Sequence, residues 1–222
     1  MRERPILFSA PMVRALLTGE KTQTRRTMKV QPVLRSGVWE LFGTGWSESI
    51  ETVPAVTDGA VALNCPYGRL GDRLWVREAI VAEELAGGDD GVRYLADDNW
   101  SAIPNTPEAA DRWLTLFHYG QSEGSRPSGL RGKGVPSIHM PRWACRLVLE
   151  ITSIRAERLN ACSEADAIAE GSREPSLVPI IGGGWSERDV YARLWEHING
   201  KGSWAANPWV WVVEFKKIDA DG

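Results

Sequence analysis

The sequence is poor in the residues that metal sites and disulfide frameworks require. Its 222 residues include only three cysteines, Cys65, Cys145 and Cys162, which are widely spaced and form no CxxC pair. An odd number of scattered cysteines predicts neither a disulfide framework nor a zinc site. The three histidines also lack metal-ligand spacing to one another or to a cysteine, so no metal or other cofactor is expected.

Long apolar runs are also missing. No stretch approaches the roughly 20 apolar residues that a membrane helix needs, and the N-terminus lacks a signal-peptide pattern. We therefore expect a cytoplasmic protein with no membrane partner. The net charge of -3 argues against indiscriminate coating of nucleic acid, because such coating needs a broad positive field.

Positive charge is nevertheless concentrated in two segments. Residues 21–35 hold five Lys or Arg and no acid, and residues 125–149 hold five more, again with no acid. Such segregation indicates a focused site for an anionic or nucleotide-like ligand, although chance clustering is the alternative. The hydrophobic content of 43% is sufficient for one large domain.

A basic turn follows the first predicted helix. Apolar residues with helical spacing predict a short helix that begins near Ser9 or Ala10 and ends at Gly19. Lys21 and Thr24 come next, followed by two arginines. A lysine beside other cations loses part of its preference for the charged form, so a neutral Lys21 could take a proton from the Thr24 hydroxyl. The alternative is a solvated basic edge on a surface turn.

Two later stretches also contain candidate site residues. The alternation over residues 74–80 predicts a strand that places Glu78 among apolar neighbours. A carboxylate in such a position is either paired or directed into a site. The alternative is that the strand ends there and Glu78 reaches solvent. Residues 136–143 are too rich in proline for a helix and bring together His139, Arg142 and Trp143. Arginine with aromatic rings suits stacking on a base, whereas a turn-capping His139 and a core Trp143 are the alternative.

Two capped helices and a strong strand complete the chain. Ser163 and Asp166 have capping-box spacing for a helix that ends at Gly171, and Glu170 falls in its last turn, where a carboxylate is locally unfavourable. A second helix is expected over residues 186–200, with Val190, Leu194 and Ile198 on its apolar face. Residues 209–215 form the strongest predicted strand. Strands separated by short helices favour an α+β fold built on a small curved sheet or barrel.

These motifs together resemble a known family. The spacing Gly19-x-Lys21-x-x-Thr24-x-Arg26, the Gly71-Asp72-x-Leu74 turn, the 159–170 helix and the 209–215 strand are similar to the ASCH domain, a PUA-like β-barrel family. The amino-acid sequence in residues 4–9, 21–26, 75–78 and 139–143 resembles that of ASCH proteins of phages and prophages. The resemblance implies one domain over residues 1–222, a PUA-like small curved barrel with flanking short helices, and long insertions at about 30–68 and 84–135. We expect the second insertion to be flexible or lid-like.

The resemblance also implies a function. One bacterial branch of the family removes the acetyl group from N4-acetylcytidine with a Lys/Thr/Glu set, which corresponds here to Lys21, Thr24 and Glu170. Arg26, Glu78, His139, Arg142 and Trp143 would then bind a nucleoside or modified nucleobase. The alternatives are a non-catalytic module that binds RNA or modified nucleotides, and a phage protein that binds a host protein through residues 84–135.

Overall fold

The computed structural model describes residues 1–36, 38–41, 44–48, 55–57, 64–120, 131–177 and 184–218. Within these ranges the protein is a mixed α+β structure with four α-helices and three sheets, and no closed barrel occurs there. The expected α+β class is confirmed. The chain divides into two compact units. Unit 1 comprises Met1–Arg4, Ala15–Leu74 and Leu149–Lys217, and unit 2 comprises Pro5–Arg14, Trp75–Val148 and Ile218–Gly222. The single domain and its insertions stay a prediction.

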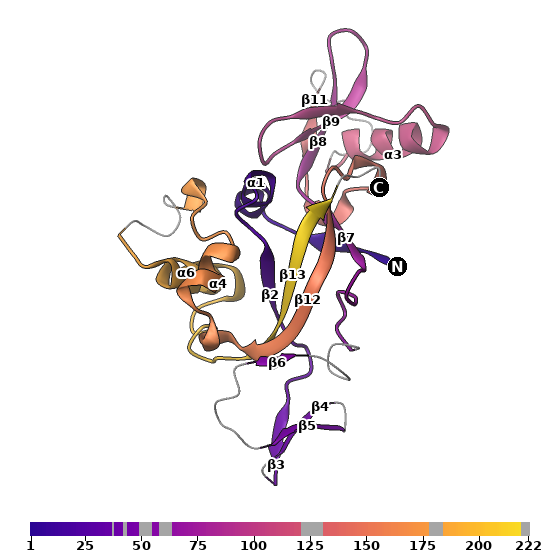
Figure 1. The fold of residues 1–222 in the computed structure, drawn as a ribbon. Helices are drawn as coiled ribbons and strands as arrows, with labels where there is room; N and C mark the ends of the chain where they lie inside the picture. Colours follow the sequence, from indigo (N-terminus) through magenta and orange to yellow (C-terminus); the bar gives the residue numbers. More distant parts are fainter. Residues whose placement is uncertain are drawn as a thin grey trace. The chain divides into compact units, whose positions relative to one another are not determined.

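The largest sheet collects strands from both ends of the sequence. Its order is β1 (Glu3–Leu7), β7 (Arg73–Arg77), β12 (Val148–Arg158), β13 (Trp209–Ile218) and β2 (Gln23–Thr27), and β6 (Ala55–Thr57) pairs with β12. Figure 1 shows β2, β13 and β12 side by side. The predicted 209–215 strand is therefore confirmed. Its residues from Trp209 to Val213 are all buried, as an uninterrupted apolar run predicts.

Two capped helices belong to unit 1. α4 (Glu164–Ala169) begins with the predicted capping box, in which the Ser163 hydroxyl accepts from the Asp166 N–H and the Asp166 carboxylate accepts from the Ser163 N–H. α6 (Glu187–Asn199) begins at Ser186 and ends at Gly200, which has a φ of 96°. Both helices contribute to a core with β13 that contains Leu159, Cys162, Ala167, Tyr191, Trp195, Val210 and Val212.

The predicted apolar face of α6 is partly wrong. Leu194 is buried as expected, but Ile198 is 61% exposed. Tyr191 and Trp195 take the inward positions instead. The predicted face was defined by aliphatic residues alone, whereas large aromatic side chains contribute more apolar area to a core.

The first predicted insertion contains antiparallel hairpins. β3 (Val33–Arg35), β4 (Val38–Leu41) and β5 (Thr44–Glu48) form a three-stranded antiparallel sheet. The rest of this insertion lies partly outside the described residues.

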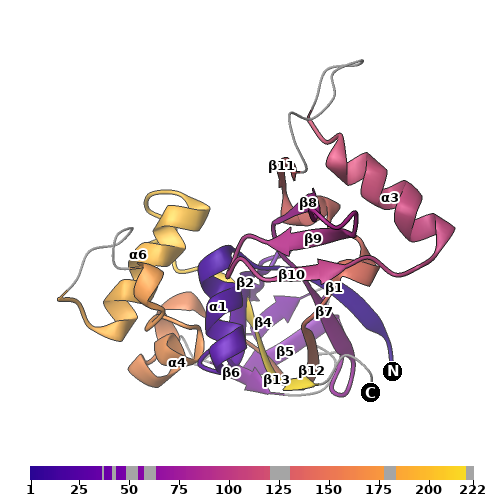
Figure 2. The ribbon, with the colours of Figure 1, turned by 90° about the horizontal axis from the view of Figure 1, so that it is seen from above.

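Unit 2 has its own sheet, helix and core. The strand order is β10 (Trp100–Ala102), β9 (Asp90–Tyr94), β8 (Ile80–Glu84) and β11 (Arg131–Val135), and α3 (Pro107–Phe117) lies beside this sheet in Figure 2. Trp113 and Leu116 of α3 are buried with residues of β8, β9 and β11. The described part of the 84–135 region is thus a packed sheet and helix. The second insertion was expected to be flexible or lid-like, and its residues 121–130 lie outside the described residues.

The strand predicted over residues 74–80 is broken into two. Leu74, Val76, Glu78 and Ile80 are all buried, as the alternation predicts. However, β7 ends at Arg77 and β8 begins at Ile80 in a different sheet. The Glu78 N–H donates to the sulfur of Met140 at 3.1 Å rather than to a strand, so the ladder is interrupted at that residue.

Candidate active site

Lys21 is held in a turn between α1 (Ala10–Thr18) and β2. The helix ends at Gly19, whose φ of 81° suits a residue without a Cβ. The Lys21 N–H donates to the Ala15 carbonyl at 3.0 Å, and the Thr22 N–H donates to the Ala169 carbonyl at 2.9 Å. The turn is therefore fixed to both α1 and α4. Lys21 is only 4% exposed, which contradicts the alternative of a solvated basic edge for this residue.

The amine of Lys21 binds Glu170, a residue far along the chain. Its Nζ donates to the Glu170 carbonyl oxygen at 2.8 Å and to Glu170 Oε2 at 3.0 Å. Glu170 is the residue that caps the C-terminus of α4, and it is buried. Its other carboxylate oxygen accepts from Arg25 Nη1 at 3.2 Å. Two cations thus offset the unfavourable placement of a carboxylate at the negative end of a helix.

The protonation of Lys21 is the central electrostatic property of the site. Burial lowers the pKa of Lys21 below its usual value of 10.5, and the Glu170 carboxylate opposes this shift. Arg26 and Arg25 lower the pKa further but contribute less. The expectation from sequence named the neighbouring cations as the cause, whereas desolvation is the larger one.

A neutral Lys21 has a defined geometry for accepting a proton. A neutral amine has two N–H donors and one lone pair. In the neutral amine, the two hydrogen bonds to Glu170 engage N–H donors, and the lone pair is the atom's proton acceptor. This arrangement resembles a general base that is oriented by a carboxylate.

Thr24 lies on β2 opposite Val213 of β13 and is 3% exposed. The side chains of Gln23 and Arg25 bind the carboxylate residues of α4 and β12. Because successive side chains of a strand project to opposite faces, Thr24 shares its face with Arg26 instead. No hydrogen bond of the Thr24 hydroxyl occurs within the described part of the chain, so the structure brings Lys21 and Glu170 together without joining Thr24 to them.

Sequence reasoning missed the larger ion-pair network around Glu170. Arg25 Nε donates to Glu157 Oε1 at 3.0 Å, and Arg25 Nη2 lies 3.2 Å from Asp166 Oδ1. Arg155 binds both of these carboxylates, at 3.1 Å and 3.2 Å. The available signal was the alternation of polar Gln23 and Arg25 along β2.

The remaining predicted binding residues belong to unit 2. Both carboxylate oxygens of Glu78 accept from Arg146, at 2.8 Å and 2.9 Å, and Arg146 also binds Asp97 at 2.8 Å. Burial raises the pKa of Glu78, and the Arg146 guanidinium opposes the shift. Glu78 is therefore a paired carboxylate, as the first of the two interpretations predicted, and is not at a strand end that reaches solvent. Its guanidinium partner also lies 3.9 Å from the centroid of the Tyr94 ring.

His139 and Arg142 lie on two short 3-10 turns and are exposed, whereas Trp143 is half-buried against the unit 2 core. The guanidinium of Arg142 lies 5.8 Å from the Trp75 ring centroid. The Trp143 indole N–H has no acceptor among the described residues. Substrate binding by these residues and by Glu78 stays a prediction.

Comparisons with known proteins do not identify the chain. No protein-family model, curated protein or solved structure matches it. The likeness to the ASCH family therefore depends on the motifs quoted above. Within the described ranges, no group of three or more His, Cys, Asp or Glu side chains could hold a metal ion. In the same ranges, no helix has both the length and the apolar character needed to cross a membrane.

Proposed function

We propose that this chain is an ASCH-type amidohydrolase, on a PUA-like curved barrel, that removes the acyl group from an N4-acylated cytosine nucleoside. The observation that carries the proposal is the buried Lys21 amine, which has a lowered pKa and is bound at 2.8 Å and 3.0 Å by Glu170. Perturbed pKa values of buried lysines are typical of catalytic bases.

The first half of the reaction forms an acyl-enzyme. Lys21 Nζ takes the proton of the Thr24 hydroxyl when substrate is bound, and Thr24 Oγ attacks the acyl carbonyl carbon. The Arg26 guanidinium and backbone N–H groups of the turn stabilise the oxyanion, and each such donor is typically worth about 3 kcal/mol in the transition state. The C–N bond then breaks, and the leaving N4 amine takes its proton from Lys21.

The second half regenerates the enzyme. Lys21 takes a proton from water, the resulting hydroxide attacks the Thr24 ester, and the carboxylic acid leaves as Thr24 recovers its proton. Glu170 touches no reacting atom in this scheme. It positions the Lys21 amine through the hydrogen bonds at 2.8 Å and 3.0 Å.

The participation of Thr24 is supported by the position of Arg26. Thr24 and Arg26 share one face of β2, and the Arg26 charge acts on the Lys21 amine. The Thr24 face of the strand is therefore within electrostatic reach of the Lys21 amine. Catalytic hydrogen bonds that are absent without substrate commonly form when substrate binds.

The test measures cytidine release from N4-acetylcytidine by purified protein and by three variants. Thr24→Val removes the nucleophile and Lys21→Met removes the base, so each should lower the rate by at least about 100-fold. Thr27→Val is the matched control, because Thr27 lies on the same strand but is exposed. An unchanged rate in folded Thr24→Val would contradict the mechanism, and no release by the folded wild type would contradict the activity.

A non-catalytic module for RNA or modified nucleotides is the second candidate. In unit 2, the guanidinium groups of Arg77 and Arg142 lie 5.2 Å and 5.8 Å from the Trp75 ring centroid. Clustered guanidinium and aromatic groups suit single-stranded RNA. This candidate predicts salt-dependent RNA binding that is unchanged in Thr24→Val, whereas the enzyme requires that hydroxyl.

A further inference from the structure

A cavity in unit 1 is lined by several arginines. It has a volume of about 340 Å³ and is lined by Met1, Arg2, Arg4, Cys65, Gly68, Arg69, Leu70 and Asp72. This volume lies within the range of small-ligand sites, about 300 to 1,000 Å³. The cavity shares no residue with the Lys21 and Glu170 site.

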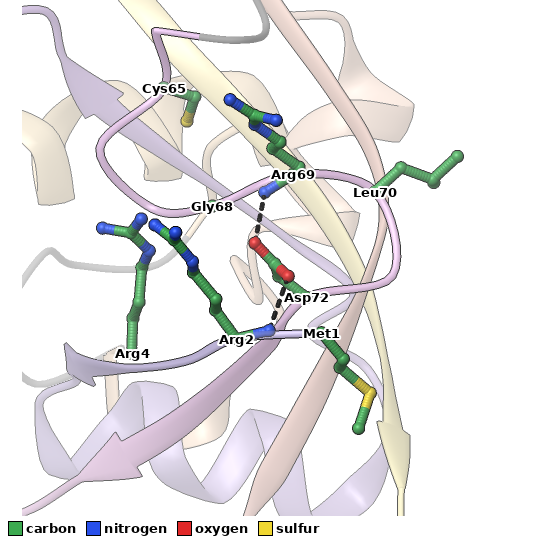
Figure 3. Close-up of a pocket in the computed structure, with 8 residues that line it drawn as sticks. All are labelled: Met1, Arg2, Arg4, Cys65, Gly68, Arg69, Leu70 and Asp72. Carbon is green, nitrogen blue, oxygen red and sulfur yellow. Dashed lines mark hydrogen bonds between the residues drawn. The ribbon is translucent and has the colours of Figure 1, made fainter.

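The arginines come from two segments that β pairing brings together. Arg4 lies on β1 and Arg2 directly precedes that strand, so the two side chains share one face. The Arg73 N–H donates to the Arg2 carbonyl at 2.8 Å, which joins this segment to the end of the 68–72 turn. In Figure 3 the Arg2 and Arg4 side chains extend together toward residues 65–68, while Leu70 points away.

The only carboxylate in the lining is already engaged. Asp72 Oδ1 accepts from the Arg2 backbone N–H at 2.7 Å, and Oδ2 accepts from the Arg69 backbone N–H at 3.1 Å. The Arg2 hydrogen bond is the main reason why the pKa of Asp72 lies below its usual value. Asp72 therefore fixes the backbone of both segments. Gly68 permits this turn, because a Cβ there would come within 3.1 Å of Asp72.

The guanidinium groups lack carboxylate partners. Among the described residues, Arg2, Arg4 and Arg69 form no ion pair. Arg4 Nη1 donates only to the Pro66 carbonyl at 3.3 Å, and the buried Arg4 Nε–H has no acceptor in the same ranges. Burial raises the pKa of Cys65 to about 11, so its thiol adds no negative charge at neutral pH. Three positive charges thus face the cavity against one carboxylate.

We propose that this arginine cavity binds a phosphate group. Guanidinium groups bind phosphate oxygens through paired, charge-assisted hydrogen bonds, and three of them around one cavity satisfy several oxygens at once. The phosphate belongs either to a free phosphorylated molecule such as a nucleotide or to the backbone of an RNA strand. The proposal does not depend on the amidohydrolase, because it concerns binding at a different set of residues.

The test uses isothermal titration of the full chain with inorganic phosphate, with cytidine 5′-monophosphate, with cytidine and with a short single-stranded RNA. The Arg2→Gln/Arg69→Gln variant alters two exposed side chains, so the fold should be retained. It should weaken phosphate or nucleotide binding by at least about 10-fold. The affinity of the wild type should also fall as salt is added.

A control variant separates the cavity from general surface charge. Arg35→Gln/Arg173→Gln removes the same charge from two exposed arginines of unit 1 that pair with Glu40 and Glu187. It should leave binding unchanged. Binding of phosphate and nucleotide that is lost only in the cavity variant supports a free phosphorylated ligand. Binding of RNA alone, with the same variant dependence, supports a backbone phosphate.

Two results would overturn the proposal. One is that neither phosphate, nucleotide nor RNA binds the folded wild type. The other is that the cavity variant and the control variant weaken binding equally, since the arginines would then act only through net charge.

Discussion

The Glu170→Gln substitution tests whether the Lys21 amine depends on a buried carboxylate. The substitution keeps the shape of the side chain and the backbone carbonyl, so Lys21 retains its 2.8 Å hydrogen bond to the residue 170 carbonyl. It removes the negative charge that lies 3.0 Å from Lys21 and 3.2 Å from Arg25. Removing one partner of a buried ion pair typically costs about 3–5 kcal/mol of stability, and the retained hydrogen bond favours the lower end.

The chain supplies a matched control for this experiment. Glu150 and Lys216 also belong to unit 1, and their 3.1 Å separation is nearly the same as that of Glu170 and Lys21. Their side chains are 32% and 59% exposed, against 3% and 2% for the buried pair. Glu150→Gln should therefore change the free energy of unfolding by no more than about 1 kcal/mol.

The assay is urea unfolding of the wild type and both variants, followed by circular dichroism. Glu170→Gln should lower the free energy of unfolding by about 3 kcal/mol, a large fraction of the stability of a typical domain. Equal effects of Glu170→Gln and Glu150→Gln would refute the reasoning, because burial would then have no influence on how much an ion pair contributes to the free energy of unfolding.

Two further predictions concern Lys21 and the unit 2 sheet. Because the folded pKa of Lys21 is lowered, the folded chain binds this proton less tightly than the unfolded chain, so the stability of the wild type relative to Lys21→Met should rise with pH until about 10.5. Urea unfolding across this pH range measures it, and a constant difference would contradict the lowered pKa. Gly91→Ala should cost about 3 kcal/mol or more, since its Cβ would lie 2.2 Å from the Trp100 ring and 2.5 Å from the Ser101 carbonyl oxygen. The control Gly87→Ala meets no atom closer than 3.6 Å and should melt like the wild type; equal melting temperatures of both variants would show that the β9–β10 contact relaxes freely.

Local hydrogen bonding explains why several elements could be predicted. Two helices are defined by side chains and backbone within a few residues of each end. One begins after Ser163 and ends before Gly171, and the other lies between Ser186 and Gly200. The 209–215 strand follows from an apolar run without Gly or Pro. These signals depend only on neighbours in sequence.

The predictions that went wrong depend on distant partners. The strand over residues 74–80 breaks because Met140 and Arg146, more than 60 positions later, bind Glu78. Ile198 is exposed because aromatic residues of the same helix meet the core instead. Neither outcome is visible in a pattern of apolar spacing.

The candidate site also combines features that follow from local sequence with features that depend on tertiary packing. The sequence by itself determined that Lys21 follows a helix end, that Thr24 comes three residues later and that Glu170 caps a short helix, because each depends on local geometry. Only the tertiary structure decided that Glu170 meets Lys21 across 149 positions and that Arg25 joins a buried network with Glu157. Burial and charge pairing are properties of the packed chain, and desolvation by that packing is what lowers the pKa of Lys21.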